Sequence, residues 1–311
     1  MQFLRRPLES TGWLMAALTA VFGVLMLVDP RLIEGAPAWL KPLKFAVSTG
    51  IYSLTLAWML RFLPAWPRLV RRVALITASV FVVEVALIAV QAARGTISHF
   101  NTGSAVDGAI FSVMGLAIFT QTLAAVAVTV ALWRQTFADR AMGWALRLGM
   151  TLAVVGASVG GIMTQPTTAQ LAQARESQLM PRSGAHTVGG PDGGPGLPGT
   201  GWSTEHGDLR APHFVGLHAM QVLPLVALLV TRRRRGREPV GGWTVIGAAV
   251  SYGALFVILL VQALLGQSLI APTGPIASAL VAWAAGTFAF ALVAWRVTGA
   301  PLAAHTALEI A

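Results

Sequence analysis

Three of the six histidines in this chain lie between His206 and Pro224, where a polar segment passes into an apolar one. The same stretch holds Asp208, Arg210 and Gln221. Imidazole and carboxylate groups bind zinc, iron and copper in proteins, and two imidazoles can ligate a haem. Polar groups that continue into a membrane helix are costly in lipid, so they usually line an interior site. The stretch therefore predicts a site where the apolar segment begins.

A metal or haem site here needs ligands from more than one part of the chain. His213 and His218 are five residues apart, about 140° around a helix, so one regular helix cannot offer both to one ion. His99 paired with His206 or His218 is the better combination. For each histidine the alternative is a hydrogen-bonded structural role, and Asp208 has the alternative of capping a helix. The candidate metal ligands are His99, His206, Asp208, His213 and His218, and the candidate cofactors are haem, zinc, iron and copper.

An inner shell of polar groups is predicted below these histidines. Glu84 lies near the middle of an apolar segment, and Gln91 falls on the same helical face. A carboxyl group in hydrocarbon faces an interior site or hydrogen-bonds across helices as a protonated acid. At 1.5 Å per residue, Glu84, Tyr52 and Gln221 all lie about 12 to 15 Å from the ends of their segments. The residues expected to handle protons or take part in catalysis are Glu84, Tyr52, Gln91 and Gln221.

The composition is that of a multi-span membrane protein. Of the 311 residues, 55% are apolar and 11% are charged, whereas a soluble domain carries about 25% charged residues. The net charge of +10 does not indicate nucleic acid, because basic residues accumulate in the cytoplasmic loops of such proteins. The absence of cysteine excludes disulfides, c-type haem attachment and cysteine-ligated iron–sulfur clusters.

Eight apolar stretches approach the roughly 20 residues needed to cross a bilayer. We therefore expect residues 1–311 to form one all-α membrane domain, a bundle of eight transmembrane helices. Gly156 and Gly160 in the fifth stretch predict close approach of a neighbouring helix. The stretches are Gly12–Val28, Phe45–Leu63, Val73–Ala93, Ala109–Trp133, Met142–Met163, Pro212–Val230, Trp243–Leu265 and Ile276–Trp295.

The arginines give the expected orientation, because they concentrate on alternate connections. Cytoplasmic loops carry the excess of Lys and Arg, so both termini are predicted to be cytoplasmic in a bacterial inner membrane. Every histidine except His305 then faces the periplasm. The arginines that set this orientation are Arg5, Arg6, Arg61, Arg68, Arg71, Arg72, Arg134, Arg140, Arg232 to Arg235 and Arg237.

Residues 164–210, between the fifth and sixth spans, are predicted to form an extracytoplasmic cap. Thr168–Gln178 predicts a short helix, whereas Pro181–Gly207 is too rich in Gly and Pro for one regular element. Loops longer than about 12–15 residues are usually functional lids or disordered, so a flexible linker is the alternative. Gly194–Gly199 matches the spacing of a dinucleotide-binding loop, but no strand precedes it and no helix follows it.

Several cations on the predicted outer side run against the usual charge bias. Four cations, Lys41, Lys44, Arg94 and Arg210, lie at span ends where basic residues are rare, and snorkelling at the interface is the alternative explanation. A cluster of cations attracts an anionic or headgroup-bearing solute. The candidate ligand contacts are Lys44, Arg94, Asn101, Asp192, Arg210 and Gln262.

Three strings resemble signatures of a group of bacterial multi-span membrane proteins that has no assigned activity. They are Arg94–Asn101 (RGTISHFN), Asp192–Pro198 (DGGPGLP) and Gly207–Pro224 (GDLRAPHFVGLHAMQVLP). The resemblance implies a multi-span membrane fold and no particular reaction.

Three functions follow from these residues. The first is a membrane redox or metal-dependent protein with a periplasm-facing His, Asp and Glu site. The second is a transporter or receptor for a small anionic or lipid-like solute, which would use the same pocket without a metal. The third is a structural or accessory membrane subunit. The lipid bilayer is a partner under all three, and nucleic acid is not expected.

Overall fold

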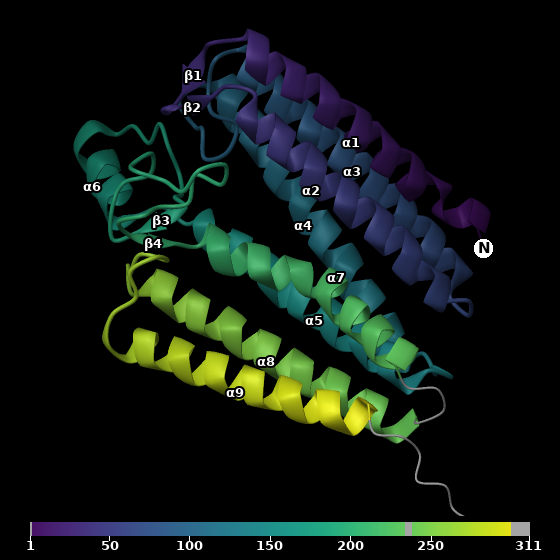
Figure 1. Cartoon of the computed structure of the whole chain (residues 1–311). Helices are drawn as coiled ribbons and strands as arrows, with labels where there is room; N and C mark the ends of the chain where they lie inside the picture. Colours follow the sequence, from purple (N-terminus) through teal and green to yellow (C-terminus); the bar gives the residue numbers. More distant parts are fainter. Residues whose placement is uncertain (1, 234–237, 300–311) are drawn as a thin grey trace, which may run out of the picture.

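A computed structural model describes residues 2–233 and 238–299 of the chain (Figure 1). The described residues are mostly helical, and eight helices are long and apolar enough to cross a membrane. The prediction of an all-helical chain with eight helices that could span a membrane is therefore confirmed. The eight helices are α1 (Gln2–Val28), α2 (Leu40–Met59), α3 (Pro67–Ala93), α4 (Ala105–Arg134), α5 (Arg140–Met163), α7 (Arg210–Arg233), α8 (Glu238–Leu264) and α9 (Gly274–Gly299).

Most of the helices are longer than their apolar stretches predicted, because polar residues at the ends also favour helix. Pro67 starts α3 in the first turn, where its missing N–H costs no hydrogen bond. The side chain of Ser104 caps α4 by accepting a hydrogen bond from the backbone N–H of Asp107. Asp139 caps α5 in the same way. Length and hydropathy locate a span, whereas capping residues decide where the helix begins.

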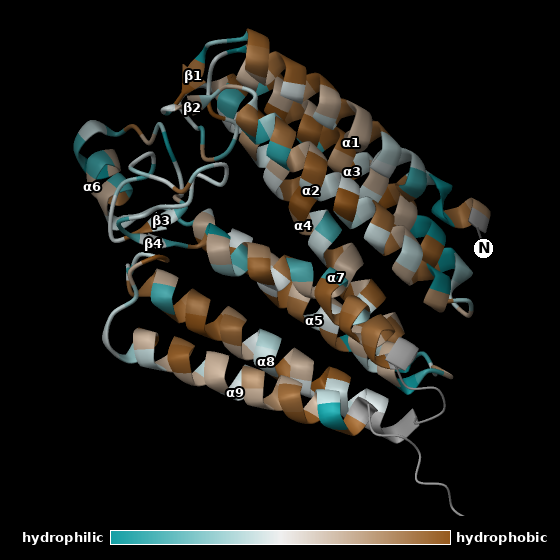
Figure 2. Ribbon diagram, in the orientation of Figure 1, coloured by the Kyte–Doolittle hydropathy of each residue, from teal (hydrophilic) through white to brown (hydrophobic). Residues whose placement is uncertain are grey.

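Figure 1 shows the helices in two groups. The first comprises α1 to α4 and the second comprises α5, α7, α8 and α9, and the groups meet mainly where α4 packs on α5. The closest pair of helices is α5 and α7. Figure 2 shows apolar residues along the helices and hydrophilic residues at their ends and in the connections, as membrane-crossing helices require.

The α5–α7 connection, residues 164–209, lies over one end of the helices (Figure 1). It contains the predicted short helix as α6 (Thr168–Ser177), which begins with a capping box formed by Thr167 and Gln170. The rest is irregular apart from β3 (Thr187–Val188), which pairs antiparallel with β4 (Gly207–Asp208). A second small hairpin, β1 (Leu32–Ile33) with β2 (Ala36–Pro37), and the 3₁₀ turn Leu60–Phe62 complete the described elements.

Helices α5 and α7 approach closely because glycines face each other. A Cβ added at Gly156 would meet the backbone of Gly216 at about 2.5 Å, closer than any real contact. The predicted packing role of Gly156 is therefore confirmed. Gly160 is less constrained, since its nearest neighbour is the ring of His213 at 3.5 Å.

Substitution of Gly156 by Val is expected to destabilise the protein by about 1–3 kcal/mol or more, because α5 and α7 must separate. Thermal unfolding in detergent measures the effect. Gly161→Val is the matched control on the same helix, since a Cβ at Gly161 has no heavy atom within 4 Å. Equal melting temperatures for the two variants would contradict the close approach of α5 and α7.

Candidate functional site

A cavity of about 340 Å³, here called the α2 pocket, lies at the end of the helices beneath the α5–α7 connection. Its walls are the first turn of α2, the β1–β2 hairpin, the loop after α3 and the glycine-rich part of the connection. Its charged and imidazole groups come from residues far apart in the sequence. They are Glu34, Lys41, Lys44, His99, Arg182, His186, Asp192 and Arg210.

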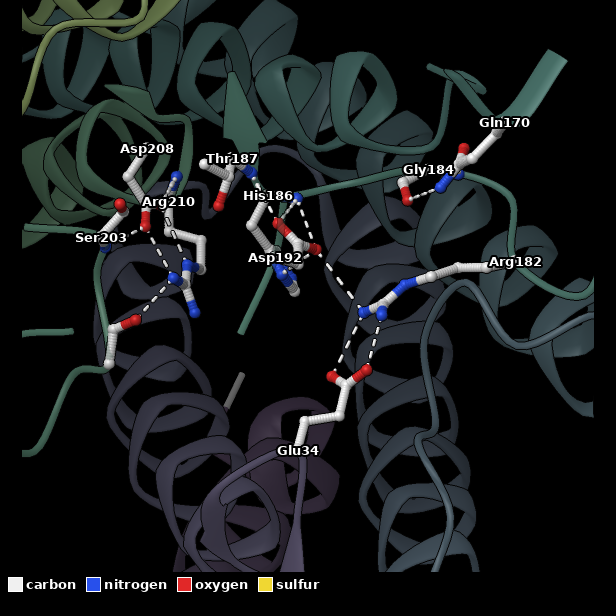
Figure 3. Close-up of polar contacts among 11 residues, drawn as sticks. Glu34, Gln170, Arg182, Gly184, His186, Thr187, Asp192, Ser203, Asp208 and Arg210 are labelled. Carbon is white, nitrogen blue, oxygen red and sulfur yellow. Dashed lines mark hydrogen bonds and ion pairs between the residues drawn. The ribbon is translucent and has the colours of Figure 1, made fainter. Parts of the chain in front are cut away.

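Two of the four cations in the pocket are neutralised by carboxylates (Figure 3). Arg182 Nη1 lies 2.5 Å from Glu34 Oε1, and its Nη2 lies 3.6 Å from Asp192 Oδ2. Arg210 donates to both carboxylate oxygens of the buried Asp208, at 2.9 and 2.6 Å, and to the carbonyl of Gly201 at 2.7 Å. These contacts attach the α5–α7 connection to β1–β2 and to the start of α7.

The two lysines of α2 are not neutralised in this way. Lys44 Nζ donates to the carbonyl of Thr200 at 2.9 Å, so it holds the connection without losing its charge. Lys41 lines the pocket and is partly buried. Its ammonium forms no hydrogen bond or ion pair with any residue that the structure describes, and Glu34 and Glu84 act on it only at longer range. Positive charge therefore remains in the pocket.

The N-terminus of α2 adds to this positive field. Leu40, Lys41 and Pro42 line the pocket, and no side chain caps the helix at Trp39. The first turn contains no acidic residue. Free N–H groups and the helix dipole give such an end a partial positive charge that favours anions.

Glu84 and His99 form a carboxyl–imidazole pair behind the pocket wall. His99 Nε2 lies 3.4 Å from Glu84 Oε1, and His99 Nδ1 lies 3.1 Å from the hydroxyl of Ser98. Glu84 is 1% exposed, and neither of its oxygens has a hydrogen-bond partner among the described residues. Burial lowers the pKa of His99 well below its usual value, and the charge of Lys41 adds to this shift. The imidazole is therefore neutral at neutral pH.

Asp192 organises the connection above the pocket (Figure 3). Its carboxylate accepts hydrogen bonds from the backbone N–H groups of His186, at 3.0 Å, and Thr187, at 2.8 Å. Burial alone would raise the pKa of Asp192, but the contacts with His186 and Thr187 hold it below its usual value. Burial lowers the pKa of His186, although its contact with Asp192 opposes the shift.

Three of the predicted ligand contacts hold structure rather than line the pocket. Arg94 forms an ion pair with Asp107 at 2.7 Å, which ties the end of α3 to the start of α4. Asn101 donates to Thr96 within its own turn, at 3.1 Å. Gln262 donates to the carbonyl of Ser268 at 2.6 Å, in the turn after α8. The other three, Lys44, Asp192 and Arg210, line the pocket.

The predicted inner shell is divided among separate contacts. Gln91 donates to Asp107 at 2.9 Å and also contacts Arg94, so it belongs to the joint between α3 and α4. Tyr52 accepts a hydrogen bond from Gln121 of α4 at 3.3 Å, and Gln221 donates to Thr55 of α2 at 3.3 Å. Two of the four contact residues that line the pocket: Glu84 lies beside His99, and Gln91 donates to the carbonyl of Ile97 at 3.3 Å.

The predicted metal ligands are likewise dispersed. His213 Nδ1 lies 2.8 Å from the carbonyl of Gly156, and His218 Nδ1 lies 3.3 Å from Gln221 Oε1. The ring of His206 packs beside Gly190, and Asp208 is paired with Arg210. Within residues 2–233 and 238–299, no three His, Asp or Glu side chains gather in a way that could hold a metal ion.

Lys41 was recognised as one of the outward cations but was not among the candidate ligand contacts, and Arg182 and His186 were not selected at all, although all three line the pocket. Lys41 carried a signal, since it lies three residues before Lys44 at the same span end. Arg182 and His186 stand in an irregular segment, where no periodicity shows which way a side chain faces.

Comparison with protein-family models, with curated proteins and with solved structures found no match to this chain.

Replacing Asp192 with Asn is expected to loosen the α5–α7 connection by about 1–2 kcal/mol, because hydrogen bonds to a charged acceptor become bonds to a neutral one. Hydrogen exchange of the amides between residues 182 and 209, followed by mass spectrometry, reports the loss of protection. Glu205→Gln removes the same charge from an exposed side chain in the same segment. Equal protection in both variants would show that Asp192 does not organise the connection.

Acid is expected to destabilise the protein from just below pH 6.5. The pKa values of His99 and His186 are lower in the folded protein than their usual value of 6.5, so the unfolded chain binds protons first. This contribution to stability is complete above pH 6.5 and is lost as the pH falls below it. Melting temperatures in detergent from pH 8 to 5 measure the slope, which His186→Phe should flatten. An unchanged slope in that variant would contradict the assignment to His186.

Proposed function

We propose that the protein binds a small anionic solute, bearing carboxylate or phosphate groups, in the α2 pocket, and that it acts as a receptor or transporter for it. The observation that carries this proposal is Lys41, a partly buried ammonium that lines the pocket and has no partner among the described residues. A charge partly withdrawn from water without a counter-charge is costly, so a compensating anion is the natural occupant.

The surroundings of Lys41 support an anion of modest size. Lys44 and the uncapped N-terminus of α2 also favour a negatively charged ligand. The volume of about 340 Å³ is within the usual range for small-molecule sites, which starts at about 300 Å³. His99 and Ser98, which also line the pocket, supply neutral hydrogen-bonding groups that would orient the solute.

We place the protein in a bacterial inner membrane, with both termini in the cytoplasm and the pocket facing the periplasm. The arrangement of arginines supports this orientation. Arg61, Arg68, Arg134 and Arg140 lie at the ends of α2 to α5 that are opposite to the pocket. The arginines at positions 234, 235 and 237, and His305, lie outside the described residues.

The metal-dependent or redox alternative has less support. It requires the histidines and carboxylates to converge, and the candidate ligands among the described residues each have separate contacts. A purely structural subunit does not account for a positively charged cavity.

The variant Lys41→Gln is expected to weaken anion binding by at least about tenfold, the value of one charge-assisted hydrogen bond. Isothermal titration of the purified protein with inorganic phosphate and with succinate measures this loss, and titration with vesicles containing phosphatidic acid tests a lipid as the source of the phosphate group.

Arg31→Gln is the control for Lys41→Gln. It removes one positive charge at the same end of the helices, but Arg31 is paired with Asp29 and does not line the pocket. If both variants weakened anion binding equally, the effect would come from general surface charge and not from the α2 pocket. Failure of wild-type protein to bind any of the three probes would overturn the proposed function.

A further inference from the structure

One face of α2 carries polar residues from the pocket down to the middle of the membrane. Lys44, Ser48, Tyr52 and Thr55 are spaced by four, four and three residues, so they share one side of the helix. All four are partly buried or exposed. At 1.5 Å per residue this stripe is about 16 Å long.

Helix α7 carries a stripe with the same spacing, formed by Arg210, Phe214, His218 and Gln221. Both helices start at the pocket end, so the two stripes run in the same direction. The ring of Phe214 packs on His218 with centroids 4.1 Å apart, and Trp202 of the connection packs on Phe214 at 5.6 Å.

The two stripes meet at their two ends across the boundary between the helix groups, while Tyr52 in the middle contacts Phe81 of α3 and Gln121 of α4. At the top, Lys44 and Arg210 both line the pocket, and their charges repel. At the bottom, Gln221 Nε2 donates to Thr55 Oγ1 at 3.3 Å. Between these points α2 and α7 do not pack closely against each other. We call the two stripes and the space between them the α2–α7 seam.

Polar side chains at this depth are poorly suited to contact lipid. Hydroxyl, imidazole and amide groups in hydrocarbon cost free energy unless they have polar partners. The amide oxygen of Gln121, which is buried beside Tyr52, has no partner among the described residues. The hydroxyls of Ser48 and Thr55 donate to carbonyls of their own helix, at 3.3 and 2.7 Å, so their oxygens keep only part of their hydrogen-bonding capacity for water or a polar solute.

Below Thr55 and Gln221 the seam is closed by the apolar core. Leu56 and Met59 of α2 and Leu223 of α7 are each no more than 1% exposed and belong to one buried cluster. The polar groups of the pocket and of the seam thus lie on one side of this apolar core. A transporter in which one side is open and the other is closed has this arrangement.

We propose that the α2–α7 seam carries the anionic solute from the α2 pocket to the middle of the membrane, so that the protein is a transporter rather than a receptor. This inference rests on the proposed function. The lysines capture the anion at the mouth, and the neutral groups of Tyr52, His218 and Gln221 then replace its water in steps. Passage requires the Gln221–Thr55 hydrogen bond to break and the two helix groups to separate there.

The chain has no cysteine, so paired thiols can be placed without background. Thr55→Cys with Gln221→Cys, joined by a short bis-methanethiosulfonate reagent, would lock the bottom of the seam. Uptake of radiolabelled phosphate or succinate into proteoliposomes is expected to fall at least tenfold and to recover after reduction. Binding of the same probe in the pocket is expected to be unchanged.

Ser251→Cys with Thr287→Cys is the matched control. These hydroxyls lie 2.6 Å apart and join α8 to α9 within one helix group. The same reagent should leave uptake intact there. Where the first pair fails to cross-link, Gln221→Leu replaces it and is expected to lower uptake without lowering binding.

Three outcomes separate the two proposals. Absence of binding in wild-type protein overturns the proposed function itself. Binding without uptake overturns only the transport route and makes the protein a receptor. Uptake that survives a verified cross-link between positions 55 and 221, or the Gln221→Leu substitution, also overturns the α2–α7 seam as the route.

Discussion

The inability of hydrocarbon to hydrogen-bond polar groups governs this structure. Each polar group therefore needs a hydrogen-bond partner within the protein, and most polar side chains at the helix ends find one among neighbouring residues. Asp107, for example, accepts from Ser104, Gln91 and Arg94 and so joins α3 to α4. The exceptions are informative. Lys41 lacks a partner among the described residues, and both oxygens of Glu84 lack hydrogen-bond donors there, although His99 lies close by. Lys41 lines the α2 pocket, where an anionic occupant would supply the missing partner, and Glu84 lies just behind the pocket wall.

Two carboxylates of the α5–α7 connection give this pocket its roof. Asp192 holds the backbone of His186 and Thr187, and Asp208 holds Arg210 and the backbone of Ser203. Each is a short side chain that fixes several donors in a segment with little regular structure. The glycines of the connection allow the close backbone approaches that such folding needs. At Gly207, a Cβ would collide with the carbonyl of Ala263.

The division into two helix groups connects the pocket to the interior. Glycines make α5 and α7 almost one unit, whereas α2 and α7 face each other with polar side chains and few close contacts. The contact between α2 and α7 is weak for this reason, although Phe100 and Phe111 pack with Val159 and Met163 of α5 elsewhere on the boundary. The buried cluster around Leu56, Met59 and Leu223 packs apolar side chains together deeper in the membrane. In the proposed transport route, the solute moves along the polar, loosely packed part of the α2–α7 seam and stops at the apolar cluster.

The sequence alone determined the eight spans, because the length and hydropathy of a helix are local properties. It also showed that Lys44, His99 and Arg210 stand at the same end, since depth follows from position along a span. Only the tertiary structure decided which side chains meet. Gln91 and Arg94 were predicted site residues and instead join two helices, while Arg182 and His186 entered the pocket from an irregular segment. Contacts such as Arg182 with Glu34 join residues far apart in the chain, and helix packing and loop path, which no local periodicity encodes, bring them together.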